Sequence, residues 1–551
     1  MAAQRTGPIV IDGRIDEAAW QAATPITNFL QTQPTEGARA TQRTEVRVLF
    51  DNDAVYVGAR MYDSLGRNGV RAPLARNDQL LNGNQLTSDK IAILFDSFHT
   101  HQDRAWFEVN PAGVKGEEFN GDPSFDPVWE ASSRIDSLGW TAEMRIPLTQ
   151  LRFSRDSVQT WGFQIWRNVD RLNELDMWSF WKRNEAGGPA FFGHLEGLRF
   201  AGRQRQLELV PYVVSREQFK FASPGDPFHK SSSGAIRGGL DAKVLLTSNL
   251  TLDATVNPDF GQVEVDPATV NLSAFETFFE EKRPFFVAGQ NAFDYGGFNC
   301  IFCDNVSNLG LFYTRRIGRS PQLNGYVDGQ SSFDDVPENT QILGAAKITG
   351  RANGFTVGLL DAVTNRETAN YRTGAAPNAT LSRDVEPLSN YFVGRVKRDF
   401  RDGATSFGGI VTSTMRRLDD SLLANRLRNR ANVLGLDVNH SWSHHDYSVL
   451  AQFAVSDVGG SDSAIALTQQ SSAHYFQRID RHETTDGLFD VRYDPARTTL
   501  RGYGLYARLA KDNGDWLWET AQNWRSPGFE VNDLAFLNRA DYKWMLGNIS
   551  R

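Results

Sequence analysis

From about residue 204 to its end, the chain consists of strand-length stretches in which every second residue is apolar. Leu434 and Leu436, for example, alternate with Gly435 and Asp437. Successive side chains of a strand point to opposite faces, so each stretch has an apolar and a polar side. No apolar run reaches the about 20 residues of a membrane-spanning helix. Because backbone groups in a bilayer must be paired within the protein, this pattern predicts a transmembrane-type antiparallel β-barrel over residues 201–551.

A large soluble all-β protein, such as a propeller or stacked sandwiches, shows the same alternation and is the alternative. Two features favour the barrel. Charged residues stand in mid-strand on the polar side, where a dry core tolerates them poorly and a wet barrel interior tolerates them well; examples are Asp241, Lys347, Asp437 and Arg508. The connections between stretches are also either short or long, as at the two rims of a porin-like barrel.

The two ends of the sequence bear on export and on closure of the barrel. The first residues lead directly into polar sequence, without the apolar stretch of a signal peptide. A bacterial outer-membrane localisation is therefore inferred from the barrel pattern alone. Residues 548–551 interrupt a strand where bacterial barrels usually finish on an aromatic residue, so we expect the barrel to be incomplete at its C-terminus.

Charge and cysteine content narrow the possible partners. A formal net charge of −8 and the absence of long Lys/Arg runs argue against nucleic acid. The two cysteines, Cys300 and Cys303, form a C-x-x-C pair with no second pair or nearby histidine to complete a zinc site. In an exported protein, we expect them to form a disulfide across a short loop.

The first 200 residues have a different pattern, with shorter candidate strands separated by turns. This spacing predicts a β-sandwich. The candidate strands are residues 45–50, 54–62, 90–95, 105–109, 141–146 and 161–168.

Several strings in this part resemble the family 9 carbohydrate-binding module. They are V-I-D-G-R-I-D-E from Val10, E-V-R-V-L-F-D-N-D from Glu45, S-D-K-I-A-I-L-F-D from Ser88, G-W-T-A-E-M-R-I-P from Gly139 and F-F-G-H-L from Phe191. The resemblance implies a β-sandwich over residues 1–200 and a glycan or other surface ligand as partner. Binding members clamp a sugar ring between two tryptophans, and those positions fall near Leu86 and Ala186 here.

Other residues in this part could take over ligand binding. Tryptophan faces stack on sugar rings and a carboxylate accepts hydrogen bonds from hydroxyls, while core packing is the alternative role for each tryptophan. The candidates are Trp106, Asp126, Trp129, Trp178 and Trp181.

A cluster of carboxylates near the N-terminus is a candidate ion site. Asp12, Asp16 and Glu17 could together hold Ca²⁺, which prefers oxygen ligands, or they could cap a turn. We expect no other cofactor.

The join between the two parts contains the most distinctive string of the chain, N-P-D-F-G-Q-V-E-V-D-P from Asn257. Asp266 and Pro267 are typical of a helix start and Pro284 of a helix end, which predicts a helical insert at about residues 266–283. With L-G-L-F-Y-T-R-R-I-G-R from Leu309, this region resembles the DUF5916 family, whose members combine a family-9-like module with an outer-membrane barrel.

Charged residues of the join have two possible roles. A pair of carboxylates could hydrolyse glycosidic bonds, or the charges could belong to a plug that pairs with a polar barrel wall. The residues concerned are Asp259, Glu264, Glu276, Glu281, Arg283, Arg315 and Arg316.

The sequence therefore predicts an all-β protein of the outer membrane with an N-terminal β-sandwich, a β-barrel and a helical insert. Its partners would be a glycan or other surface ligand and outer-membrane lipid, and its role the binding or uptake of glycan-derived solutes. The alternative is an enzyme of carbohydrate catabolism that acts on O-glycosyl bonds.

Overall fold

The computed structural model describes the chain except for residues 78–86, 121–124, 126, 152, 155, 186, 201–206, 220–222, 230–231, 248–249, 259–271, 273–275, 280, 296–308, 353, 375, 402 and 482–484. Strands dominate and the helices are short, so the predicted all-β class is confirmed. No helix in the described ranges combines the length and apolarity needed to cross a membrane.

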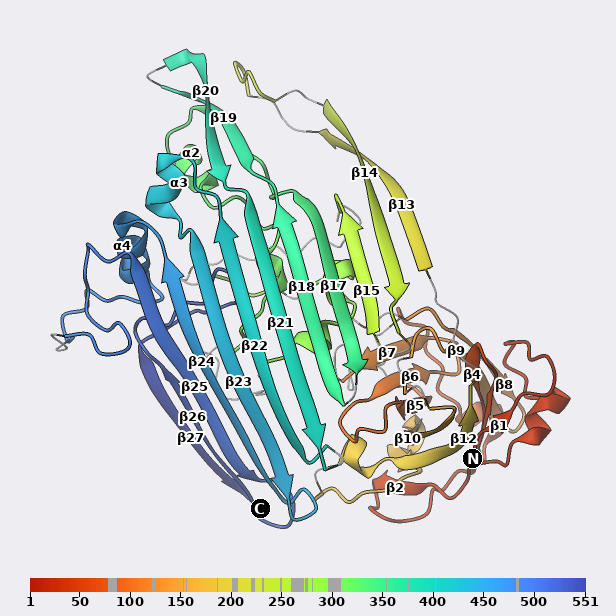
Figure 1. The fold of residues 1–551 in the computed structure, drawn as a ribbon. Coiled ribbons are helices and arrows are strands. Elements are labelled where there is room, and N and C mark those ends of the chain that lie inside the picture. Colours follow the sequence, from red (N-terminus) through yellow and green to blue (C-terminus); the bar gives the residue numbers. More distant parts are fainter. Residues whose placement is uncertain are drawn as a thin grey trace.

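The N-terminal part is a sandwich of two sheets (Figure 1). One sheet has the order β1 (Ala3–Gln4), β3 (Thr44–Phe50), β4 (Ala54–Tyr62), β9 (Gly139–Pro147) and β8 (Glu130–Asp136). The other has the order β2 (Leu30–Gln33), β11 (Glu174–Met177), β10 (Val158–Val169), β5 (Lys90–Asp96), β6 (Ala105–Val109) and β7 (Lys115–Phe119), and β12 (Gly193–Arg199) also pairs with β10. Short 3-10 helices are η1 (Ala18–Ala22), η2 (Gly66–Gly69), η3 (Asp170–Leu172) and η4 (Pro189–Phe191).

Alternating residues of both sheets make the sandwich core. Val57 and Met144 from one sheet meet Ile93 and Phe107 from the other, and all four are fully buried. Because the period of a strand is two, the residues between them point away from the core. The outer face of the β5–β6–β10 sheet is therefore formed by residues that are not part of this core.

A single antiparallel sheet forms most of the remainder (Figure 1). Its order is β13 (Leu207–Phe219), β14 (Ser232–Leu245), β15 (Leu250–Val256), β17 (Ile342–Ala352), β18 (Phe355–Thr364), β21 (Ser389–Phe400), β22 (Thr405–Arg416), β23 (Arg430–Trp442), β24 (Tyr447–Gly459), β25 (Thr499–Lys511), β26 (Leu517–Arg525) and β27 (Tyr542–Ser550). Its edges are β13 and β27, which do not pair with each other in the described part of the chain. Closure into a barrel therefore stays a prediction.

The connections of this large sheet differ between its two ends. At the short-turn end, the β17–β18, β21–β22, β23–β24 and β25–β26 pairs are joined by a few residues each. At the long-loop end lie α3 (Ser421–Arg426), α4 (Asp462–Gln470) and a small sheet of β16 (Phe333–Asp335), β19 (Glu367–Thr373) and β20 (Ala376–Glu386) (Figure 1). This is the asymmetry expected from the sequence.

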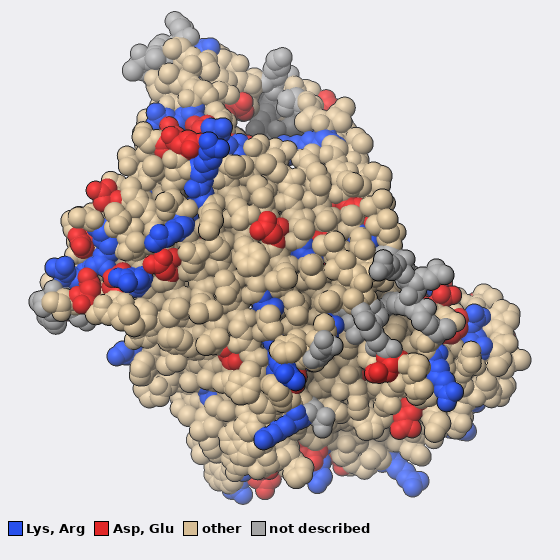
Figure 2. Space-filling view, in the orientation of Figure 1, with Lys and Arg blue, Asp and Glu red and all other residues tan. Residues whose placement is uncertain are grey.

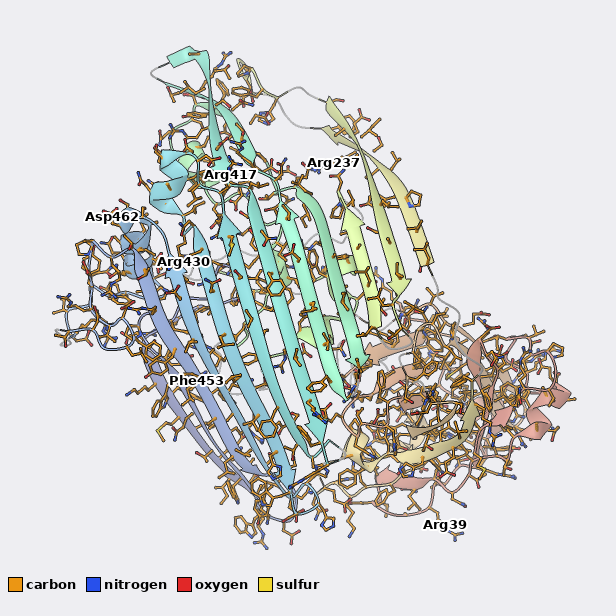
Figure 3. All side chains as sticks on the ribbon, viewed as in Figure 1. Arg39, Arg237, Arg417, Arg430, Phe453 and Asp462 are labelled. Atoms are coloured by element: carbon orange, nitrogen blue, oxygen red, sulfur yellow. The ribbon has the colours of Figure 1, made fainter. Side chains whose placement is uncertain are left out.

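One face of the large sheet is apolar and exposed. The register aligns Val411 of β22 with Leu434 of β23, and Leu436 of β23 with Phe453 of β24. These four side chains are 41 to 56% exposed. In Figure 2 only scattered charged side chains interrupt the surface over the body of the sheet. Figure 3 places Phe453 on that body, whereas Arg417 and Arg430 lie near the long-loop end.

The opposite face is covered by the chain itself. We call residues 281–295, 309–317 and 526–541 the inner segments, because they pack on inward side chains of the large sheet to form a second core. Tyr295 is one anchor, since its hydroxyl lies 3.1 Å from both the Leu436 and the Phe453 carbonyl oxygens of the wall. Another is Lys347, whose ammonium donates to the Phe285 and Ala288 carbonyls.

The predicted helical insert is wrong where the structure describes it. Residues 276–279 and 281–283 have no regular secondary structure, and Pro284 begins rather than ends a helix, α1 (Pro284–Val287). Tertiary contacts explain the difference, because the Tyr313 hydroxyl donates to the Phe279 carbonyl at 2.7 Å and accepts from its N–H. Residues 259–271, which carry the predicted helix start, lie outside the described residues. The other short helices of this part are η5 (Gln290–Phe293), η6 (Thr314–Arg316) and α2 (Asn324–Asp328).

Candidate functional site

The outer face of the β5–β6–β10 sheet carries an aromatic cluster. Register pairs Trp166 of β10 with Ala92 of β5, and Ala92 with Glu108 of β6, so these three residues lie in one row. Trp106 stands two residues before Glu108 and hence on the same face. The neighbouring Ile165 points into the sandwich core instead.

A third tryptophan completes the cluster. The Trp106 and Trp166 rings meet edge to face with centroids 5.1 Å apart, and Trp181 lies 6.0 Å from Trp166. Trp181 also stacks on Phe192 at 6.5 Å. We call Trp106, Trp166, Trp181 and Phe192 the aromatic cluster. Trp106 and Phe192 are buried, at 8 and 6% exposed, whereas Trp166 and Trp181 are half-buried. Trp166 and Trp181 are therefore the members that could offer the flat apolar faces on which sugar rings stack.

A buried carboxylate lies beneath the aromatic cluster. Glu108 is fully buried and accepts a hydrogen bond from Trp106 Nε1 at 3.1 Å, while Lys90 Nζ lies 3.3 Å from the same oxygen. Burial raises the pKa of Glu108, and Lys90 opposes this rise. Its other oxygen and the Trp166 indole N–H have no hydrogen-bond partner among the described residues. The cluster thus combines ring faces with buried polar groups, as ligand sites do.

The remaining predicted ligand residues of this part lie elsewhere. Trp129 is only 3% exposed in the sandwich core and donates to Glu117, so it has no face to offer a sugar ring. Trp178 packs on the edge of that core, 5.7 Å from Phe163. Asp126 lies outside the described residues. The structure therefore brings Trp106 and Trp181 together but separates them from Trp129.

The carboxylates proposed for calcium make other contacts. Glu17 accepts hydrogen bonds from the Val10 N–H and the Trp20 indole, and Asp12 accepts one from the Arg14 N–H. In the described ranges no group of three or more His, Cys, Asp or Glu side chains could hold a metal ion. Calcium binding stays an untested prediction.

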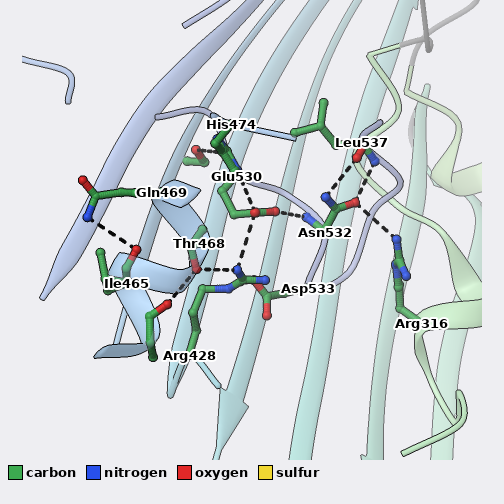
Figure 4. A network of polar contacts seen from close by, with 12 residues as sticks. Arg316, Arg428, Ile465, Thr468, Gln469, His474, Glu530, Asn532, Asp533 and Leu537 are labelled. Atoms are coloured by element: carbon green, nitrogen blue, oxygen red, sulfur yellow. Dashed lines mark hydrogen bonds and ion pairs between the residues drawn. The ribbon is translucent and has the colours of Figure 1, made fainter. Parts of the chain in front are cut away.

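An ionic network joins the inner segments to the large sheet (Figure 4). Arg316 binds both oxygens of Glu276 at 2.8 Å and donates to Asn532 at 3.2 Å. Arg428 binds Asp533 at 2.8 Å, so arginines hold two adjacent residues in the middle of residues 526–541.

A second part of the same network is fully buried. Glu530 is 3% exposed and lies 2.8 Å from His474 Nε2. Burial alone would raise the pKa of Glu530, but Arg428 and His474 hold it at about 2. Glu530 is therefore a permanent carboxylate at neutral pH.

The predicted carboxylates of the join are bound to arginines in the same way. Arg283 holds Glu281 through two hydrogen bonds of 2.9 and 2.7 Å, and the pKa of Glu281 is lowered by Arg283 in spite of its burial. Glu276 is held by Arg316, as described above. A glycosidase needs one carboxyl free to act as an acid, which neither residue offers here.

Other residues of the join are less engaged or lie outside the described part. Arg315 lies over the Phe279 ring, 5.9 Å from its centroid. Asp259, Glu264, Cys300 and Cys303 lie outside the described residues, so the predicted disulfide stays a prediction.

Trp166, His474, Glu530 and Asp533 were not among the residues predicted from the sequence. Trp166 could have been found, because it alternates with the core residues Phe163 and Ile165 of the same strand. The ionic partners could not, since His474 and Glu530 come together only through the tertiary fold.

The sandwich contacts the short-turn end of the large sheet. The Gln102 side-chain amide donates to the Gly403 carbonyl at 2.8 Å and accepts from Lys397 at 3.0 Å. The Gly514 N–H donates to the Asn184 carbonyl, also at 2.8 Å. Asn184 follows Trp181 closely in sequence, so the segment that carries part of the aromatic cluster is attached to this end of the sheet.

Solved structures with some likeness include two carbohydrate-binding proteins and a Pseudomonas aeruginosa protein. A family 9 carbohydrate-binding module from Caldicellulosiruptor kristjanssonii in complex with cellotriose is 18% identical (TM-score 0.28; 37% of this chain, 94% of that chain). A putative carbohydrate-binding protein from Bacteroides uniformis is 15% identical (TM-score 0.28; 36% of this chain, 97% of that chain). Pseudomonas aeruginosa OpdK with vanillate is 8% identical (TM-score 0.22; 80% of this chain, 67% of that chain). At these TM-scores the likenesses carry no argument about function.

Family models give the assignment. No functionally curated protein matches the chain. Residues 11–196 match the model described as carbohydrate family 9 binding domain-like, and residues 204–551, more than half of the chain, match the domain of unknown function DUF5916. The chain therefore belongs to the DUF5916 family and carries a carbohydrate family 9 binding domain-like module in front of the domain that defines it.

Proposed function

We propose that this chain is a carbohydrate-binding protein of the bacterial outer membrane. In this proposal the large sheet is part of a transmembrane wall, its exposed apolar face lies against lipid, and the sandwich captures a glycan at the short-turn end. The exposed apolar face is the observation that carries the proposal, because soluble monomers rarely expose a continuous apolar patch of this extent.

An aromatic rim supports the proposed membrane position. Outward aromatic residues gather at the short-turn end of adjacent strands, where Phe400 lies 6.1 Å from Phe407 and Trp442 stacks on Tyr447 at 5.6 Å. Tyr447 also lies 6.4 Å from Trp518. Aromatic girdles of this kind mark the membrane–water interface of outer-membrane barrels.

The aromatic cluster supports the carbohydrate part of the proposal. It lies on the outer face of a sandwich that matches a carbohydrate-binding-like model, and the half-buried rings of Trp166 and Trp181 suit pyranose stacking. The short-turn end of outer-membrane barrels faces the periplasm. A glycan-derived solute that had crossed the membrane would meet the sandwich there, so uptake is the process in which we place the chain.

Membrane association is tested by flotation of the purified full-length chain with lipid vesicles in a density gradient. The proposal expects the chain to float with the vesicles and to resist extraction by high salt. A chain that stays monodisperse in detergent-free buffer and remains at the bottom of the gradient would refute the membrane part.

Glycan binding is tested separately on a glycan array with the full-length chain in detergent micelles. Trp181→Ala should lose binding to any glycan that the parent retains. Trp516→Ala is the matched control, because Trp516 is an exposed tryptophan outside the sandwich. Equal binding by the parent and Trp181→Ala would remove the aromatic cluster from the proposal.

A further inference from the structure

Arg416, the last residue of β22, has a buried guanidinium group of which only one nitrogen makes hydrogen bonds within the described part of the chain. Its side chain is 1% exposed and points to the inner face of the large sheet. Nη1 donates to Asp533 Oδ1 at 2.5 Å and to the Arg428 carbonyl at 3.1 Å. Nε and Nη2 have no hydrogen-bond partner among the described residues.

These two unpaired nitrogens form one edge of the guanidinium. Their N–H bonds run parallel, and this edge accepts both oxygens of a carboxylate. The same chain uses it elsewhere: Arg283 holds Glu281 through Nε and Nη2, and Arg478 holds Asp480 through the same two atoms at 2.6 Å each. Arg416 presents this edge without a carboxylate from the described part of the chain.

Arg319 is a second buried arginine, and it interacts electrostatically with Arg416. The Nε of Arg319 is buried and has no partner in the described residues. Burial lowers the pKa of Arg319, and the charge of Arg416 lowers it further. Tyr391 and Glu386 act electrostatically on both arginines, and the two Glu386 oxygens already accept hydrogen bonds from Gln322 at 2.8 and 2.9 Å.

Strand register adds neutral hydrogen-bonding groups to the same inner face. Ser389 of β21 pairs with Arg416 on one side and with Thr364 of β18 on the other, and Thr414 stands two residues before Arg416. The hydroxyls of Thr364 and Thr414 are buried without partners in the described ranges. Unpaired hydrogen-bonding groups thus lie on β18 and β22, on either side of β21, whose Ser389 hydroxyl donates to the Pro387 carbonyl at 3.0 Å.

The carboxylates of the ionic network are already engaged. Asp533 is shared between Arg416 and Arg428, and Glu530 is held by Arg428 and His474, as Figure 4 shows for the Arg428 side. Neither can also serve the open edge of Arg416. A buried guanidinium edge without an acceptor costs free energy, which an oxyanion from solution would recover.

We propose that Arg416 and Arg319, with the hydroxyls of Thr364 and Thr414, bind the carboxylate group of a small organic acid at the inner face of β18, β21 and β22. An acidic sugar such as a uronate and a simple aliphatic acid share this chemistry. The inference does not depend on the proposed membrane position or on glycan binding by the sandwich.

Isothermal titration of the full-length chain in detergent micelles tests it, with acetate, D-glucuronate, D-glucose, sulfate and phosphate as separate titrants at equal ionic strength. We expect saturable binding of both carboxylates and none of glucose at this site. Acetate carries no ring, so its binding cannot come from the aromatic cluster. Stronger binding of glucuronate than of acetate would identify an acidic sugar as the ligand.

Three variants locate the site. Arg319→Gln removes a charge that makes no ion pair within the described residues, and Arg416→Lys keeps a charge for Asp533 while it removes the parallel N–H edge. Each should weaken carboxylate binding by about tenfold or more, because charge-assisted hydrogen bonds are lost. Arg417→Gln, on the exposed neighbour of Arg416, is the matched control and should bind as the parent does.

If Arg416→Lys does not fold, Arg319→Gln and Thr414→Val decide, since neither removes an observed hydrogen bond of its side chain. Three results would overturn the inference: no saturable carboxylate binding by the parent, binding that is equal in the parent and in Arg319→Gln, or sulfate or phosphate bound more tightly than the carboxylates.

Discussion

Gln102 of the sandwich and Gly403 of the large sheet are 301 residues apart in sequence, yet the Gln102 amide donates to the Gly403 carbonyl at 2.8 Å. Gly403 lies in the β21–β22 turn with φ +85°. A Cβ added there would come within 2.4 Å of the Thr100 carbonyl oxygen. The turn therefore needs glycine both for its backbone conformation and for its contact with the sandwich.

Gly403→Ala tests this contact. The positive φ alone costs about 1 kcal/mol, and the overlap with Thr100 adds a further cost or displaces the sandwich. Gly354→Ala is the matched control, because Gly354 has φ +78° in the β17–β18 turn with nothing within 4 Å of an added Cβ. We expect the urea midpoint in micelles to fall more for Gly403→Ala. Amide exchange at Gly514, whose N–H the sandwich also binds, should become faster. Equal behaviour of the two variants would show that the contact is unimportant in solution.

Gly435 tests the packing of the inner segments on the wall. A Cβ at this inward position would come within 2.4 Å of Leu311 and 2.9 Å of Tyr295. Overpacking of this kind costs about 1 to 3 kcal/mol, so Gly435→Ala should lower the free energy of unfolding by that amount. Gly409 faces outward on the adjacent strand, and its nearest contact would be 3.6 Å, so Gly409→Ala should be neutral or slightly stabilising. A neutral Gly435→Ala would mean that the inner segments do not pack there.

Because the pKa of Glu530 is lowered in the folded chain, we expect the chain to lose stability in acid. Its pKa is about 2 in the folded chain and 4.5 ordinarily, so the unfolded state binds the proton first as the pH falls. The stabilisation is present above about pH 4.5 and is lost as the pH falls toward 2. The shift corresponds to about 3 kcal/mol at most.

Glu530→Gln should lower stability at pH 7, because Arg428 and His474 lose their carboxylate, and should flatten the acid limb of the stability curve. Urea midpoints between pH 2 and 7 measure this. Asp419→Asn, on an exposed ion pair, is the control. An unchanged acid limb in Glu530→Gln would contradict the buried network.

The strand pattern was predictable from sequence because each strand position is decided locally. Leu434 and Leu436 alternate with Gly435 and Asp437, and the structure places the leucines outward and the other two inward. The charged residue predicted for the polar side of this strand also lies inward, where Asp437 pairs with Arg395 of another strand at 2.8 Å. The face of a strand on which each residue lies can therefore be predicted from the two-residue periodicity without knowing which distant residues come into contact.

The join and the candidate sites could not be predicted in the same way. The helix predicted from Asp266 and Pro284 does not form at residues 276–279. Contacts of these residues with the distant Tyr313 and Arg316 determine the backbone conformation there instead. The open edge of Arg416 depends on Asp533 binding the opposite nitrogen, more than a hundred residues later. Such relationships are set by the tertiary fold and leave no local pattern.

The most direct measurement of the central proposal is a nitroxide scan of residues 433, 434, 436, 437 and 438, one cysteine at a time, in a Cys300→Ser/Cys303→Ser background reconstituted in lipid vesicles. We expect the spin labels at Leu434, Leu436 and Val438 to be accessible to oxygen dissolved in the bilayer and shielded from a water-soluble nickel complex. The labels at Val433 and Asp437, which point inward, should be shielded from both. Outward labels that the nickel complex reaches more readily than oxygen does would contradict the proposal that this face of the sheet lies against lipid.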